Sequence, residues 1–197
     1  MRRKLIFRCL SCGDCCRNLL KEVDGNLNGL GLFPWERKLF PREMVSPQFG
    51  VGVMRKRGRL RPRRVVRYQL RVNVCPHLSE GNRCRMYESR PNACRSFPIE
   101  PTPPFGAVVS RECRFIGERT KGGEMVDIVA PEEWAASREF VKNMTEIFRE
   151  CMPLTLEGLL SFDLQTRRWR MEEEDSLKCV AGNLGKMKGK SRHRIVR

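Results

Sequence analysis

The 197-residue sequence contains only two histidines and two tyrosines, and it has no run of 18 apolar residues. A transmembrane helix needs such a run, so we expect no membrane-spanning segment. The first ten residues, MRRKLIFRCL, also lack the long apolar stretch and the cleavage site of a secretory signal peptide. We therefore expect a cytoplasmic protein, in which clustered cysteines are more often metal ligands or redox groups than disulfides.

Motifs of the common enzyme classes are missing as well. The sequence has no GxGxxG turn after an expected strand, no GxxxxGK[ST] phosphate loop and no HExxH helix. The Cys-x3-Cys-x2-Cys motif of radical enzymes that use adenosylmethionine fails because Leu19 stands where its last cysteine would be. A Cys–His nucleophile would have to combine Cys75 with His77, and a structural role explains that pair better. The sequence names no catalytic residue and leaves enzyme activity open.

Cysteine, by contrast, is abundant, with ten residues in the chain. The first group has spacings of two, two and zero residues and comprises Cys9, Cys12, Cys15 and Cys16. Two residues between thiolates allow a tight turn to bring both sulfurs to one metal, and Gly13 gives the backbone the freedom for that turn. Because Cys15 and Cys16 are adjacent, we expect their side chains to diverge and one of them to belong to a second site.

A second group of four cysteines lies in a segment rich in proline and glycine: Cys75, Cys84, Cys94 and Cys113. Eight thiolates suit two tetrahedral zinc sites or one or two iron–sulfur clusters, and the spacing does not choose between the metals. The first group is well shaped for a cubane [4Fe–4S] cluster, although Leu19 and Leu20 replace the fourth cysteine of the ferredoxin run. Disulfides are the less favoured alternative. His77 is not expected to be a ligand, and Cys151 and Cys179 are expected to be bystanders.

Three blocks carry a family resemblance: FRCLSCGDCC (Phe7–Cys16), CPHLSEGNRCRMYESRPNACRSFP (Cys75–Pro98) and SREC (Ser110–Cys113). Together they resemble the CxxCxxCC family of zinc- or iron-chelating proteins, the YkgJ-like cysteine-cluster proteins, over about residues 7–120. The resemblance implies metal chelation by the eight clustered cysteines. The family is also similar to the cysteine-rich part of flagellin lysine N-methylases, which implies a cluster-dependent protein-modifying enzyme as an alternative function. The sequence departs from the family pattern at His77 and in its arginine-rich segment between the cysteine groups.

Two arginines are candidates for tuning the metal site. Four thiolates on Zn²⁺ leave a net charge of −2. Pro91 can open a helical turn whose end holds Cys94, and Arg90 and Arg95 flank this turn. Either guanidinium could neutralise the thiolates or donate hydrogen bonds to them, which would change metal affinity and redox potential. The alternative is a surface ion pair with Glu88, which would contribute little.

The formal net charge of +16 comes from two segments. Residues 55–71 contain nine lysines and arginines and no acidic residue, and residues 186–197 contain six more. The other residues are nearly neutral, and metal–thiolate charge compensates only a few of these cations. Both segments are therefore candidates for binding nucleic acid or another acidic partner, with solubility as the alternative. A metal-stabilised, nucleic-acid-associated protein is accordingly the third candidate function.

The hydrophobic pattern predicts an α+β protein. We expect a loop-rich, metal-organised cysteine domain with short strands at 1–130, a helical extension at 131–185 and a basic tail at 186–197. Residues 60–74 alternate like a strand, or a strand pair with a break near Pro62, and the basic run would then form one strand face. Period 3.6 predicts an amphipathic helix of about 18 residues from Pro131. Thr155 could cap a further helix through Leu164, and a short helix could start at Pro34.

Overall fold

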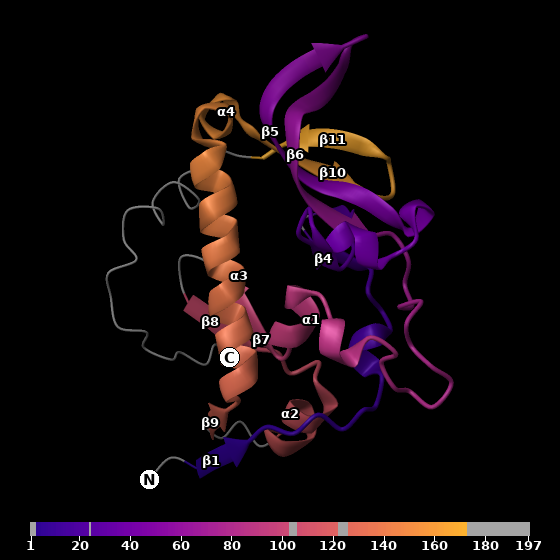
Figure 1. Ribbon diagram of the computed structural model, residues 1–197, viewed down its shortest axis with the longest axis vertical. Coiled ribbons are helices and arrows are strands. Elements are labelled where there is room, and N and C mark those ends of the chain that lie inside the picture. The colour runs from indigo at the N-terminus through magenta and orange to yellow at the C-terminus, as the bar shows by residue number, and fades with distance from the viewer. Residues whose placement is uncertain (1–2, 24, 103–105, 122–125, 173–197) are drawn as a thin grey trace. The chain divides into compact units, whose positions relative to one another are not determined.

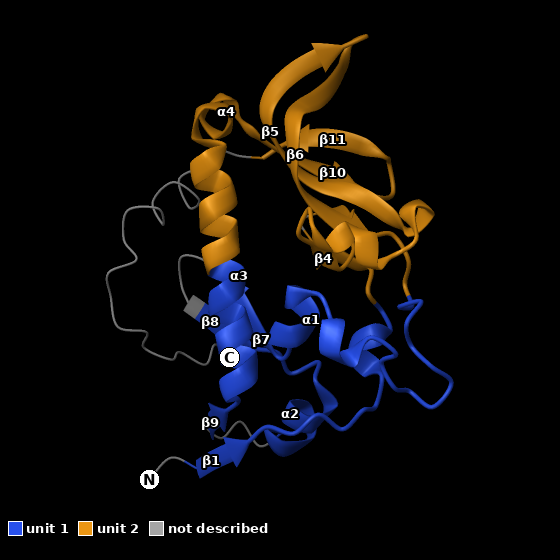
Figure 2. Ribbon diagram, in the orientation of Figure 1, with its two compact units in different colours: residues 1–18, 74–141, 190–197 blue, residues 19–73, 142–189 orange. Residues whose placement is uncertain are grey.

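The computed structural model describes residues 3–23, 25–102, 106–121 and 126–172 (Figure 1). Both helices and strands are present, as an α+β protein requires. The chain divides into two compact units, coloured separately in Figure 2. In the described part, unit 1 contains residues 3–18 and 74–141, and unit 2 contains residues 19–73 and 142–172. None of the described helices is long and apolar enough to span a membrane.

Unit 1 consists of short elements around the cysteine loops. Strand β1 (Arg3–Ile6) pairs in parallel with β9 (Val126–Val129), and β7 (Ile99–Thr102) forms an antiparallel hairpin with β8 (Gly106–Val109). The helical segments are η1 (Asp14–Cys16), η4 (Tyr87–Ser89), α1 (Asn92–Ser96), α2 (Arg114–Arg119) and the first part of α3 (Pro131–Glu150). Few apolar side chains of this unit are fully buried, among them Ile99, Ile116 and Val126.

Unit 2 is built on an antiparallel five-stranded sheet in the order β11-β10-β5-β6-β4. The strands are β4 (Gly31–Leu32), β5 (Val45–Lys56), β6 (Arg59–Leu70), β10 (Leu159–Asp163) and β11 (Arg168–Met171). The unit also contains a two-stranded sheet of β2 (Lys21–Val23) and β3 (Asn26–Asn28). Its helical segments are η2 (Glu36–Leu39), η3 (Arg42–Met44), the end of α3 and α4 (Met152–Glu157). Leu32, Leu70 and Leu160 are completely buried in its core.

Several expected elements are present. The amphipathic helix is confirmed as α3, which begins at Pro131 and is 20 residues long. The short helix after Pro34 is η2. The alternating segment is strand β6, and it runs without a break through Pro62 to Leu70. Pro62 is tolerated because it lies opposite Val53 in the two-stranded end of the hairpin, where no third strand among the described residues requires its missing N–H group.

The expected helix from Thr155 to Leu164 is wrong. Thr155 lies inside α4, where its hydroxyl donates to the carbonyl of Cys151 at 3.0 Å, and the helix ends at Glu157. Gly158 follows with φ 141°, a conformation that breaks the helix. Every residue of β10 is buried, so this short apolar segment is a central strand, which periodicity cannot distinguish from a buried helix.

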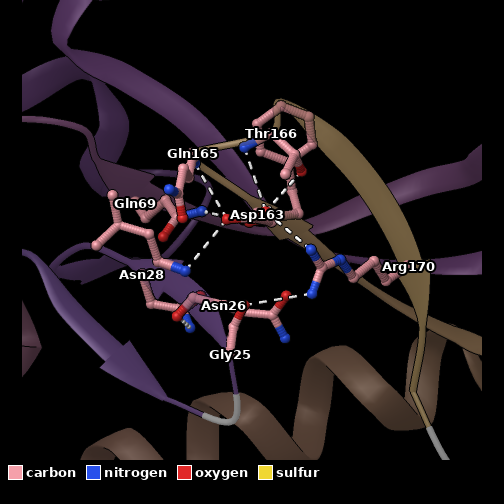
Figure 3. Close-up of polar contacts among 10 residues, drawn as sticks. Gly25, Asn26, Asn28, Gln69, Asp163, Gln165, Thr166 and Arg170 are labelled. Atoms are coloured by element: carbon pink, nitrogen blue, oxygen red, sulfur yellow. Dashed lines mark hydrogen bonds and ion pairs between the residues drawn. The ribbon is translucent and has the colours of Figure 1, made fainter.

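A polar network joins the strands of unit 2 around Asp163, at the end of β10 (Figure 3). Its buried carboxylate accepts hydrogen bonds from the backbone N–H groups of Leu27, Gln165 and Thr166 at 3.0 to 3.2 Å. It also accepts a hydrogen bond from the Thr166 hydroxyl at 2.5 Å and forms an ion pair with Arg170 at 3.2 Å. This one carboxylate therefore fixes the turn between β10 and β11 and the position of β3.

Candidate metal centre

The first cysteine group lies on a tight loop that ends in η1. Gly13 precedes this turn with φ 74°, in the left-handed region, and its carbonyl accepts a hydrogen bond from the Cys16 N–H at 3.0 Å. A Cβ atom at Gly13 would lie 2.7 Å from Nη1 of Arg17. The expected role of Gly13 is confirmed, because the loop needs both its positive φ and its lack of a side chain.

One side-chain hydrogen bond and one ion pair join this loop to segments of unit 1 that are distant in the sequence. Arg17 donates through Nη2 to Oδ1 of Asn82 at 2.5 Å and through Nη1 to the carbonyl of Cys12 at 3.4 Å. Asp14 forms a bidentate ion pair with Arg114, and both distances are 2.9 Å. Sequence reasoning missed these partners. An acidic residue inside the cysteine motif of a strongly basic chain was the available signal for Asp14.

The second cysteine group meets the first through the backbone. The N–H group of Cys75 donates to the carbonyl of Cys16 at 2.8 Å. Leu78 connects Cys75 with Cys84. Its N–H donates to the Cys75 carbonyl, and it forms a β-bridge with Cys84. Cys94 lies in α1, where its N–H donates to the Pro91 carbonyl at 2.9 Å, so the expected helical turn after Pro91 is present. Cys113 is the N-cap residue of α2.

Three thiols are in direct contact. The Cys16 thiol is hydrogen-bonded to Cys15 and to Cys75, so the expectation that Cys15 and Cys16 diverge is wrong. These hydrogen bonds raise the pKa of Cys16, the protonated member of the set. The bond from Cys16 lowers the pKa of Cys75 to about 6, despite burial and with help from the backbone and charge of His77. The same interaction, with the positive charge of Arg90, lowers the pKa of Cys15 to about 7 against the effect of burial.

Cys94 interacts electrostatically with Cys15 and Cys75 and with a further cysteine, Cys84. Burial raises the pKa of Cys94, and the charges of Cys15, Cys75 and Cys84 raise it further. The charge of Arg90 opposes this rise. Cys94 therefore lies within the field of thiols from both cysteine groups.

Cys113 also interacts electrostatically with cysteines of the first group. Burial raises its pKa, the backbone N–H groups of Ile116 and Phe115 at the start of α2 oppose the rise, and the charges of Cys12 and Cys15 add to it. Helix N-termini stabilise thiolates in this way. Cys9 is exposed, and its sulfur accepts a hydrogen bond from the Ser11 N–H at 3.4 Å.

The structure describes nine of the ten cysteines, and all nine are free thiols. Among the described residues, no three Cys, His, Asp or Glu side chains already stand in the arrangement of a metal site. The thiols are engaged with one another instead. The donor chemistry nevertheless fits zinc or iron, because the clustered side chains are soft sulfur ligands that come from several segments of one unit.

The two candidate arginines have different surroundings. Arg90 lies over the Tyr87 ring, 3.7 Å from its centroid, and Nε donates to the Tyr87 carbonyl at 2.8 Å. In this position its charge acts on Cys15 and Cys94. Arg95 instead forms a bidentate ion pair with Glu139 on α3, at 2.8 and 2.9 Å.

The remaining sequence candidates lie apart from these contacts. Cys151 is 2% exposed at the junction of α3 and α4, in unit 2, as expected for a small hydrophobic residue. Cys179 and the basic segment 186–197 lie outside the described residues. His77 acts on Cys75 through its backbone and its charge.

The arginines of the basic segment 55–71 do not form a single exposed strand face, contrary to expectation. Arg67 lies over the Phe33 ring, 5.6 Å from its centroid, and burial lowers its pKa to about 10 against the effect of Glu36. Arg71 donates through Nε to the carbonyl of Glu43. Both faces of the end of β6 are covered, so the alternation stops there. Arg67 is held by this packing, and the exposed Arg71, just after the strand, is held by its hydrogen bond to Glu43.

The fold and the site define a small cysteine-cluster domain, in which thiols from separate loops of one unit lie near one another. The model of the CxxCxxCC family, described as "Putative zinc- or iron-chelating domain", matches residues 8–122. The chain therefore belongs to this family, and all eight clustered cysteines lie within the matched range. No curated protein and no solved structure matches the chain.

Proposed function

We propose that this protein binds zinc or iron in one thiolate centre that takes ligands from both cysteine groups. The observation that carries this proposal is the row of hydrogen-bonded thiols Cys15, Cys16 and Cys75, which joins residues far apart in the sequence. The centre would be held by Cys9, Cys12, Cys15, Cys16, Cys75, Cys84, Cys94 and Cys113.

Existing contacts between the loops support a shared centre. The Cys75 N–H bond to the Cys16 carbonyl and the Asp14–Arg114 pair already hold the contributing loops together. Metal binding to these loops would replace the protons on sulfur. A bound metal would supply positive charge among the crowded sulfurs. In unit 1, where few apolar side chains are buried, this would contribute to folding stability.

The number of converging thiols bears on the type of centre. One zinc ion takes four ligands, so the eight candidate thiolates exceed what a single zinc requires. Either two zinc ions or one iron–sulfur cluster with neighbouring free thiols accounts for the excess, and a [4Fe–4S] cluster is the form we propose for iron. Arg90 is the residue that would stabilise the negative charge of either centre.

Anaerobic purification of the full chain, followed by analysis for zinc, iron and acid-labile sulfide, tests the proposal. Zinc at one or two per chain in a colourless protein supports zinc chelation. Iron with sulfide and a broad visible absorption band supports a cluster. Folded protein that contains neither metal, and takes up neither on anaerobic reconstitution, would overturn the proposal.

A further inference from the structure

The hairpin of β5 and β6 continues beyond the sheet as a ribbon of two strands (Figure 1). Strand β10 pairs with β5 only at residues 49–51, and β4 pairs with β6 only at residues 68–69. From Val53 to Pro62, therefore, no third strand in the described part is hydrogen-bonded to the pair. The turn at the tip consists of Arg57 and Gly58, with φ values of 50° and 74°, as in the two-residue turns that favour hairpins.

The register gives the ribbon one basic face. Lys56 lies opposite Arg59, and Met54 lies opposite Arg61. Directly opposed residues share a face, and so do residues two apart, so these three cations lie on the same side. The opposite face carries Arg55, which lies opposite Leu60, together with Val53 and Leu60, whose side chains pack against the core cluster of Leu160, Phe162 and Trp169. Apolar packing thus fixes which face of the ribbon is basic.

Within the described residues, the cations at the tip of the ribbon have no acidic partner. Arg55, Lys56, Arg57, Arg59 and Arg61 are exposed and form no ion pair or side-chain hydrogen bond within the described part of the chain. The next two arginines of β6 are paired: Arg63 with Glu157 at 3.1 Å and Arg64 with Glu150 at 3.7 Å. An open depression of about 710 Å³ at the tip is lined by four of the free cations: Lys56, Arg57, Arg59 and Arg61.

Arg57 is an unusual residue for its position. A left-handed conformation costs a residue with a side chain roughly 1–2 kcal/mol, and asparagine or glycine normally occupies this place in the turn. Here an arginine occupies it and adds one more cation at the extremity of the ribbon. Turn stability alone does not explain that choice of residue.

We propose that this ribbon binds double-stranded DNA by inserting its basic face into the major groove and contacting the phosphates on either side. The major groove of B-form DNA admits a two-stranded ribbon, whereas the deep, narrow major groove of double-stranded RNA does not. Single-stranded nucleic acid is normally bound by stacking on aromatic side chains, and residues 53–64 contain none. Arginine contacts with phosphates alone predict binding that is independent of sequence and strongly dependent on salt.

The test compares two triple variants of the metal-loaded full chain. K56Q/R59Q/R61Q removes three cations from the ribbon, and K38Q/R42Q/R149Q removes three exposed cations elsewhere in unit 2. Affinity for a short DNA duplex of arbitrary sequence is measured by fluorescence anisotropy across a salt series. We expect the ribbon variant to bind at least about tenfold more weakly near 0.15 M salt, with a logarithmic salt slope smaller by about 2.7. The control should remain close to the parent.

A further variant, Arg57→Asn, separates charge from folding. Asparagine favours the turn conformation, so the hairpin should be at least as stable while DNA binding weakens. Equal losses in the ribbon and control variants would show a general charge effect and overturn the proposal. So would an absence of duplex binding at low salt, or equal or tighter binding of single-stranded DNA, double-stranded RNA or anionic vesicles. The proposal does not depend on the nature of the metal centre.

Discussion

The backbone N–H of Cys75 donates to the carbonyl oxygen of Cys16 at 2.8 Å, and the thiols of the same two residues are hydrogen-bonded to each other. These two hydrogen bonds join the two cysteine groups, although residues 19–73 lie between the groups in the sequence. A metal ligated by one group therefore lies within reach of the other. The predictions on the metal centre depend on this connection.

Replacing Cys75 by serine should remove metal from the protein. Cys75 is the one member of the second group in contact with Cys16, and a serine hydroxyl is a poor ligand for zinc or iron. We expect the metal content per chain after anaerobic purification to fall by half or more. Cys151→Ser is the matched control, because Cys151 is a buried cysteine of unit 2, apart from the candidate ligands. Equal metal content in both variants would contradict a shared centre.

Replacing Gly13 by alanine should weaken metal binding. The new Cβ atom would meet Nη1 of Arg17 at 2.7 Å and side-chain atoms of Leu78 and Asn82 at 3.2 Å, displacing the contact between Arg17 and Asn82. A chelator competition titration should show at least about tenfold lower affinity, equivalent to about 1.4 kcal/mol.

Gly25→Ala is the control for this substitution. Gly25 also has a positive φ, 69°, but no atom lies within 4 Å of its Cβ position. Both variants carry a similar backbone cost of about 1 kcal/mol. Only Gly13→Ala should change metal affinity. If both variants bind metal like the parent, close packing around the η1 loop is not required for the centre.

The sequence pattern was sufficient for some elements and not for others. Helix α3 and strand β6 were predictable because each has a long apolar periodicity that burial on one face enforces. Strand β10 was missed because all five of its residues are buried, which leaves no alternation to detect. Its partner β5 precedes it by a hundred residues, and local propensity contains no information on such pairing.

The candidate site shows the same division. The spacing of Cys9, Cys12 and Cys15 is by itself typical of metal ligation. The contact between Cys15 and Cys16 was not predictable, because it depends on how the η1 turn directs two adjacent side chains and on the partner Cys75. The burial of Arg67 could not be predicted either, since Phe33 covers it only in the folded sheet.

Asp163 should make the stability of unit 2 sensitive to acid. Burial alone would raise the pKa of this carboxyl, but hydrogen bonds from Thr166, Gln165 and Leu27 outweigh that effect and lower the pKa below its ordinary value. A depressed folded-state pKa stabilises the protein above the unfolded pKa of about 3.9, and the stabilisation is lost as the pH falls through the folded-state value. Asp163→Asn removes the charge at every pH.

Urea unfolding followed by tryptophan fluorescence measures this effect. Near neutral pH, Asp163→Asn should lower the free energy of unfolding by about 2 kcal/mol, because charge-assisted hydrogen bonds are lost. The difference from the parent should begin to shrink below about pH 4, where the unfolded parent takes up a proton at this carboxyl, and shrink further as the pH falls through the lowered folded-state pKa. A difference that stays constant down to about pH 2 would contradict an ionised Asp163 in the network.

Substitutions at Arg90 and Arg95 test which of the two charges controls the pKa values of the thiols. The charge of Arg90 lowers the pKa of Cys15 and opposes the rise in the pKa of Cys94, so Arg90→Gln should raise both. The Cys15 pKa is about 7, and a higher value leaves less reactive thiolate near neutral pH. In metal-free protein, we expect Cys15 to react roughly twofold to threefold more slowly with iodoacetamide at about pH 7.

Arg95→Gln removes the same charge five residues further along the chain, in α1, but that guanidinium is paired with Glu139. Its alkylation profile should match that of the parent, as resolved for Cys15 by mass spectrometry across a pH series. The two variants should also differ in metal affinity, because only Arg90 acts on the candidate ligands. Identical alkylation profiles for Arg90→Gln and Arg95→Gln would mean that Arg90 does not control thiol ionisation, and the charge of a metal–thiolate centre would then have to be balanced by other groups.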